Sequence, residues 1–133
     1  MGFENLIKVG IVKKVPIDVI RAKSLMKSSE QTLNSARKIP VEEERLKTIL
    51  RELYESLRQY CEAVGYLRGY KFINHESIAV FLDEILGEKE ISIKFDRYRK
   101  LRNGINYYGN DIDTSTVKEA LKEIPLMVNK LKK

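Results

Sequence analysis

The chain has 133 residues, a length that one domain most simply accounts for. With 43% hydrophobic and 33% charged residues, the composition is typical of a globular protein and excludes an intrinsically disordered one. The formal net charge of +6 fits an anionic partner such as nucleic acid or a nucleotide. Cys61 is the only cysteine, so no internal disulfide can form, and no apolar run reaches the ~18–20 residues of a membrane-spanning helix. We therefore expect a cytoplasmic protein without a membrane segment.

The start of the chain has no clear pattern, so residues 1–14 are expected to be a short lead-in to one domain over residues 15–133. In that domain, apolar residues first recur at helical spacing from Val15 to Arg37. Pro16 suits the first turn of this helix, and Pro40 ends it.

The clearest helical pattern comes next. A helix of about 27 residues is predicted from the acidic segment at residues 42–44 to Gly69. Its apolar positions alternate spacings of four and three residues over three heptads: Leu46, Leu50, Leu53, Leu57, Tyr60, Val64 and Leu67. Such a helix packs along its whole length, either inside a bundle or across a dimer.

Three further helices are predicted. They cover residues 77–86, with Asn74 as the cap, residues 91–107, and a segment that starts near residues 113–115 and runs to the C-terminus, where Pro125 should kink or split it. The apolar stripe of the fourth helix is predicted to be Ile91, Phe95, Tyr98, Leu101, Ile105 and Tyr108. No segment alternates with period two for long enough to predict a strand. The predicted fold is all-α, an antiparallel up-and-down bundle of about five helices.

Residues 97–109, RYRKLRNGINYYG, combine cations, amides and phenols on the fourth helix. The polar face at helical spacing consists of Arg99, Arg102, Asn103 and Asn106, with Tyr107 beside it. Guanidiniums bind phosphate with paired donors, amides orient a ligand, and a phenol can stack on a base. The same pattern also describes the polar edge of an ordinary amphipathic helix. Gly104 costs about 1 kcal/mol inside a helix, unless another backbone approaches closely there.

The hexapeptide from Arg102 to Tyr107, together with QYCEAVGYLRGYKFINHESIAVFLDEIL at residues 59–86, resembles the HEPN domains, in particular their archaeal members. The resemblance covers roughly residues 15–131. It implies an α-helical domain that is usually dimeric. Many HEPN proteins are metal-independent ribonucleases with an Arg-x4-6-His motif, and the two motifs of a dimer face one composite site. By this resemblance, Arg102 would neutralise the scissile phosphate and Asn103 would take the polar position beside it.

The chain departs from that motif because Tyr107 stands at the position of the histidine. A phenol with a pKa of about 10 is almost wholly protonated at pH 7, and loss of a positioned base typically lowers the rate about 10²–10⁴-fold. The only histidine, His75, lies at the start of the third helix, where it most simply packs or is solvated. It could instead approach the Arg102 surface in the folded dimer and supply the missing acid or base. One histidine without a cysteine or acid cluster predicts neither a metal site nor a cofactor.

Three functions stay open from the sequence. The first is a non-catalytic HEPN-like dimer that binds RNA or a nucleotide, pairs with a partner such as a minimal nucleotidyltransferase, or does both. Its candidate binding residues are Arg99, Arg102, Asn106, Tyr107 and His75. The second is a weak metal-independent endoribonuclease, the toxin of a toxin–antitoxin pair, with Arg102, Asn103 and Tyr107 as candidate catalytic residues. The third is a purely structural interaction protein. All three predict a homodimer, because the polar motif lies next to an apolar seam that another helix should cover.

Overall fold

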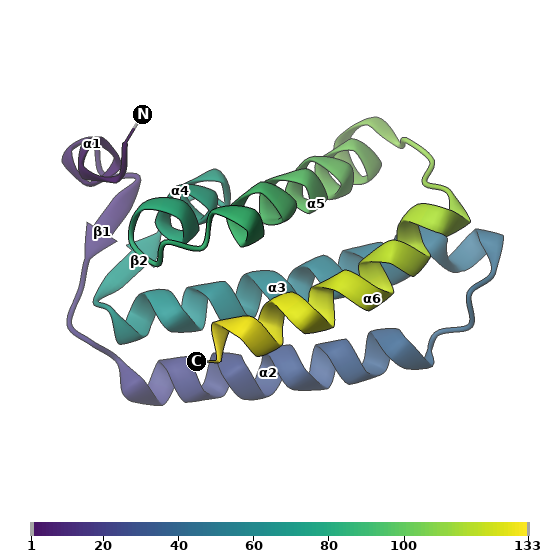
Figure 1. The fold of residues 1–133 in the computed structure, drawn as a ribbon, viewed down its shortest axis with the longest axis horizontal. Coiled ribbons are helices and arrows are strands. Elements are labelled where there is room, and N and C mark those ends of the chain that lie inside the picture. The colour runs from purple at the N-terminus through teal and green to yellow at the C-terminus, as the bar shows by residue number, and fades with distance from the viewer. Residues whose placement is uncertain (1, 133) are drawn as a thin grey trace.

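The computed structural model describes residues 2–132 and contains, in that part of the chain, six α-helices and two short strands. The predicted domain boundaries at Met1 and Lys133 lie outside these residues. The elements in chain order are α1 (Phe3–Lys8), β1 (Val12–Lys14), α2 (Val19–Lys38), a 3₁₀ turn (Glu43–Arg45), α3 (Leu46–Leu67), β2 (Tyr70–Phe72), α4 (Glu76–Glu84), α5 (Lys89–Tyr108) and α6 (Thr114–Leu131). The long helices run along the long axis of the molecule, with α1 and the strands at one end (Figure 1). The predicted all-α bundle is confirmed.

Helix α3 is the centre of the bundle and contacts α2, α5 and α6. Its apolar face is buried as the heptad pattern predicts, from Leu46 to Tyr60, whereas Leu67 at its end is exposed. The helix has 22 residues and is shorter than the predicted 27, since the acidic segment before it forms a separate 3₁₀ turn at Glu43–Arg45. Burial of one apolar side chain of this size stabilises the fold by roughly 1.5–3 kcal/mol, so α3 supplies much of the core.

The predicted start of the first long helix is wrong by four residues, because α2 begins at Val19. The backbone N–H of Val15 donates to the carbonyl of Gly69 at 2.9 Å, and that of Asp18 donates to Tyr66 at 3.2 Å. Residues 15–18 therefore run beside the end of α3 as extended chain. The Asp18 carboxylate then caps α2 by accepting a hydrogen bond from the N–H of Arg21.

Most of the N-terminal lead-in has regular structure. Strand β1 pairs antiparallel with β2, Val12 opposite Phe72. Phe3 on α1 is 2% exposed and packs edge-to-face on Tyr70 of β2. With three residues each, the strands are too short for an alternating pattern to predict them.

The last two long helices agree with the predicted segments except at two positions. Helix α5 ends at Tyr108 and is capped by Gly109, whose φ of 64° is the left-handed conformation that favours glycine. The predicted buried stripe includes Tyr108, but this residue is 80% exposed because it lies in the last turn, beyond Ile105, the last residue of α5 that is buried. Helix α6 begins at the cap residue Asp113 and continues across Pro125 without a break, so the predicted split does not occur.

Candidate functional site: a cationic pocket at the start of α4

The sole histidine lies beside the arginine of the α5 motif, within one chain. Nδ1 of His75 is 2.8 Å from Nη2 of Arg102. The position of His75 is fixed because Asn74 caps α4, its side-chain oxygen accepting a hydrogen bond from the N–H of Ser77 at 2.8 Å. The sequence predicts this cap, and it also allows an approach of His75 to the Arg102 surface in the folded dimer. The antiparallel packing of α4 on α5 makes the contact without a second subunit.

A third side chain, Tyr54 of α3, lies beneath this contact. Its hydroxyl is 3.0 Å from Nδ1 of His75, and Cζ of Arg102 lies 4.9 Å from the centre of its ring. Tyr54 is 1% exposed, so its position is set by the core. We call His75, Arg102 and Tyr54 the His–Arg–Tyr cluster. Sequence reasoning missed Tyr54, because an aromatic residue on a mostly apolar helix is usually part of the core.

Of the three arginines whose charge acts on His75, Arg102 differs in its partners. Arg58 forms ion pairs with two glutamates of α3, and Arg99 lies 2.8 Å from the carboxylate of Asp96. Among residues 2–132, no carboxylate lies within 4.0 Å of the guanidinium of Arg102. Its guanidinium contacts the His75 nitrogen and lies over the face of the Tyr54 ring.

Burial, together with the positive charges of Arg58 and Arg102, lowers the pKa of His75 from its ordinary value of 6.5 to about 4. His75 is therefore neutral at pH 7. A guanidinium only donates hydrogen bonds, so Nδ1 of His75 accepts, and the hydrogen-bond network assigns the ring proton to Nε2. Burial raises the pKa of Tyr54 to about 12, although the neighbouring Arg102 acts in the opposite direction, so the phenol keeps its proton.

The polar pocket at this cluster has a volume of about 300 Å³. It brings together most of the predicted site residues, and its lining consists of Asn74, His75, Glu76, Arg99, Arg102, Asn103 and Tyr107. Tyr107 is 70% exposed at the pocket. Asn106, which was predicted to share this surface, does not line the pocket, since its side-chain oxygen accepts a hydrogen bond from Nε of Arg51 at 2.6 Å.

From the sequence, a close approach of another backbone at Gly104 would offset the cost of a glycine inside a helix. The closest neighbour of a Cβ at Gly104 is instead a side chain. A Cβ there would lie 2.8 Å from the side-chain nitrogen of Asn110, the end of an exposed side chain. The backbone N–H of Asn110 donates to the carbonyl of Gly104 at 3.1 Å, so the chain after α5 turns back over this glycine.

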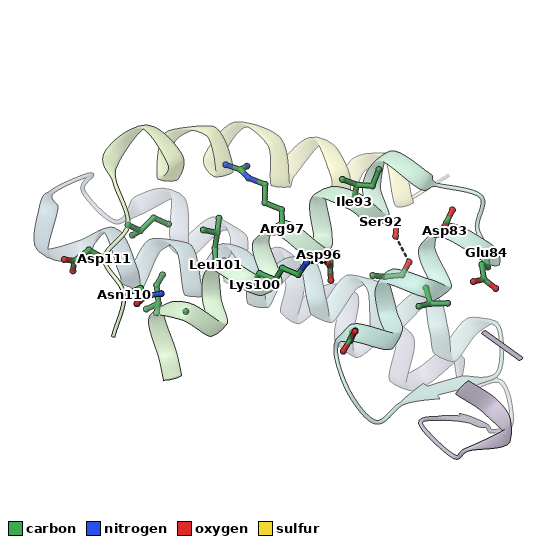
Figure 2. A pocket seen from close by; sticks show the side chains of 16 residues that line it. Asp83, Glu84, Ser92, Ile93, Asp96, Arg97, Lys100, Leu101, Asn110 and Asp111 are labelled. Atoms are coloured by element: carbon green, nitrogen blue, oxygen red, sulfur yellow. Dashed lines mark hydrogen bonds and ion pairs between the residues drawn. The ribbon is translucent and has the colours of Figure 1, made fainter. Parts of the chain in front are cut away.

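A larger groove of about 810 Å³ lies between α4 and α5 and extends to the loop before α6 (Figure 2). Its apolar lining is Ala79, Val80, Ile93, Leu101, Ile105 and Ile112. The α4 side carries Asp83 and Glu84, whereas Arg97 and Lys100 project from α5 (Figure 2). The groove shares Glu76 with the cationic pocket, so the two sites adjoin.

Fold and pocket together define the chain as an all-α bundle with a cationic, histidine-containing pocket. Comparisons with protein-family models, with curated proteins and with solved structures gave no match. Between residues 2 and 132, no helix combines the length and apolar character that crossing a bilayer requires. No group of three His, Cys, Asp or Glu side chains that could hold a metal ion occurs in the same residues.

Proposed function

We propose that the chain is a HEPN-like, non-catalytic module that binds single-stranded RNA, or a nucleotide with the same chemistry, in the cationic pocket. The observation that carries this proposal is the guanidinium of Arg102, which lines an open pocket and has no carboxylate partner in the described residues. A guanidinium presents paired donors that match a phosphate, and it cannot lose its charge at neutral pH.

The other groups of the pocket suit the remaining parts of a nucleotide. Asn103 offers an amide, and the Nε2–H of His75 offers a further donor for a phosphate oxygen. The exposed ring of Tyr107 can stack on a base, which is how proteins commonly bind unpaired nucleotides. Glu76 is the one acid in the lining, and its charge would oppose an anion bound next to it.

The direct test is fluorescence anisotropy with a short labelled oligouridylate. Arg102→Ala should weaken binding roughly 10–100-fold, the value of a hydrogen bond to a charged group. Arg37→Ala changes the net charge equally but lies on α2 outside the pocket, so it should have a much smaller effect. Equal effects of the two variants would contradict the proposal. Competition by free nucleotide would show that a single phosphate and base suffice.

Cleavage of RNA is the second candidate, because a histidine 2.8 Å from an arginine is the pair that phosphodiester cleavage would use. In this arrangement Nδ1 of His75 already accepts a hydrogen bond and Nε2 holds the proton, so neither nitrogen is free to act as a base. We therefore expect no cleavage in the presence of a chelator. Cleavage that is lost in both Arg102→Ala and His75→Ala would instead establish a metal-independent ribonuclease.

The proposal includes a homodimer in which the α4–α5 groove is covered by a second copy. The α4 side of the groove is acidic, whereas the α5 side carries Arg97 and Lys100 next to Asp96, with which Lys100 pairs. Two copies related by a two-fold axis can place the α4 side of one against the α5 side of the other. Burial of the groove would remove its apolar lining from water. A nucleotidyltransferase partner and a role as a toxin stay predictions from the resemblance.

A further inference from the structure

We infer that Tyr54 is a positioning residue of the cationic pocket. When Arg102 binds a phosphate, the hydroxyl of Tyr54 replaces it as the hydrogen-bond donor to Nδ1 of His75. The inference rests on the proposed function and adds a residue that does not itself touch the ligand. Tyr54 is not among the residues that line the pocket, yet it contacts two of them.

The contact distances place two donors at one acceptor. Nδ1 of neutral His75 has a single lone pair, while Nη2 of Arg102 is 2.8 Å away and the hydroxyl of Tyr54 is 3.0 Å away. Only one of them can form a full hydrogen bond at a time. The free pocket therefore already holds a second donor for Nδ1, in place before any ligand arrives.

A phosphate would change which donor is used. Its oxygens attract the paired N–H groups of Arg102 more strongly than a neutral ring nitrogen does. If no other donor were present, His75 would be left with an unpaired, partly buried Nδ1, which would weaken ligand binding. The Tyr54 hydroxyl avoids that loss, and by holding Nδ1 it leaves Nε2–H as the ring donor that can bind the ligand.

Tyr54 is suited to this role because it is fixed and because a hydroxyl both donates and accepts. Its ring is 1% exposed and packs at 5.6 Å, centre to centre, on Phe95 of α5. If the negative ligand brings a proton onto His75, the same hydroxyl can accept from Nδ1–H, so it satisfies either protonation state. Since Cζ of Arg102 lies over the ring, Tyr54 also supports the guanidinium from below.

The test is a double-mutant cycle of RNA affinity with wild type, Tyr54→Phe, His75→Ala and the double variant. Phe keeps the ring beneath Arg102 and removes only the hydroxyl. Tyr54→Phe should weaken binding roughly 3–10-fold in the wild-type background and have no further effect in the His75→Ala background. Tyr60→Phe removes another nearly buried hydroxyl from α3, away from the pocket, and should leave the affinity unchanged.

A second readout follows the sole histidine by its ¹⁵N chemical shifts. With RNA bound, wild type should keep the proton on Nε2 and a hydrogen-bonded Nδ1, whereas Tyr54→Phe should lose the signature of a hydrogen-bonded Nδ1. An equal loss of affinity in both backgrounds, or none in either, would overturn the role of Tyr54. If Arg102→Ala also binds like wild type, the proposed function itself fails, so the two failures are distinguishable.

Discussion

His75 and Arg102 meet because local signals place each of them and the packing of two helices then joins them. Asn74 fixes the start of α4, and the spacing of the α5 motif places Arg102 on the side that faces it. The resulting environment is unusual for a histidine, since the ring lies among guanidiniums and is partly buried. Two consequences can be measured on single residues.

The first consequence is a pH dependence of stability. The pKa of His75 falls from 6.5 in the unfolded chain to about 4 in the folded one, so below pH 6.5 the unfolded chain takes up a proton that the folded chain does not. The free energy of unfolding should therefore fall as the pH drops from 6.5 towards 4. At about pH 5 the loss should be at most about 2 kcal/mol, because solvent screens the charges around the partly exposed ring. Urea denaturation at neutral and acidic pH measures it. His75→Gln should lack this part of the loss; an identical loss in that variant would contradict the assignment.

The second measurement compares two adjacent tyrosines by their effect on RNA affinity. Tyr107 and Tyr108 are both highly exposed near the end of α5, but only Tyr107 lines the pocket. If Tyr107 stacks on a base, Tyr107→Ala should lower the affinity for single-stranded RNA by roughly 1–3 kcal/mol. Tyr108→Ala is the matched control and should bind like wild type in the same anisotropy assay. A larger effect at Tyr108 would place the bound base elsewhere.

At the scale of the elements, the long helices could be predicted because each has its own apolar stripe and end signals. The start of α2 could not, since the hydrogen bonds that keep residues 15–18 extended go to Tyr66 and Gly69 at the end of α3. The pairing of His75 with Arg102 depends on the turn between α4 and α5, where Gly87 has a φ of 67°. Local sequence predicts both helices, but not how they lie against each other.

Two glycines inside helices should respond in opposite ways to alanine. At Gly104 a Cβ would meet the exposed side chain of Asn110, which can turn aside, so Gly104→Ala should raise the free energy of unfolding by up to about 1 kcal/mol, the difference in helix propensity. At Gly65 a Cβ would lie 2.5 Å from the ring of Phe72, which is buried, so Gly65→Ala should destabilise by roughly 1–3 kcal/mol. Denaturant unfolding measures both. Destabilisation at Gly104 equal to that at Gly65 would show that Asn110 cannot move aside.

At the scale of the whole molecule, the cationic pocket and the α4–α5 groove adjoin, so a second copy in the groove would bring two pockets near one interface. Of the apolar side chains that line the groove, Ile93 is 63% exposed and available for such a contact, whereas Ile105 is buried. Apart from Glu76 the groove and the pocket have different lining residues, so the oligomeric state and RNA binding can be measured with separate variants.

The proposed homodimer can be tested by placing a charge in the groove. Ile93→Glu should dissociate the dimer without unfolding the chain, because the side chain is already exposed in one copy. Leu126→Glu on α6, where the side chain is 61% exposed outside the groove, is the matched control and should stay dimeric. Light scattering at micromolar concentration measures both. A monomeric wild type would contradict the dimer directly.

The most direct test of the central claim follows the ring of His75, the only histidine, in a ¹H–¹³C spectrum during titration with single-stranded RNA. The account predicts that its ring signals shift and saturate with the dissociation constant measured by anisotropy, and that Arg102→Ala weakens both together. RNA that binds wild type at saturation while the His75 signals stay in place would contradict the account, because the ligand would then lie outside the pocket.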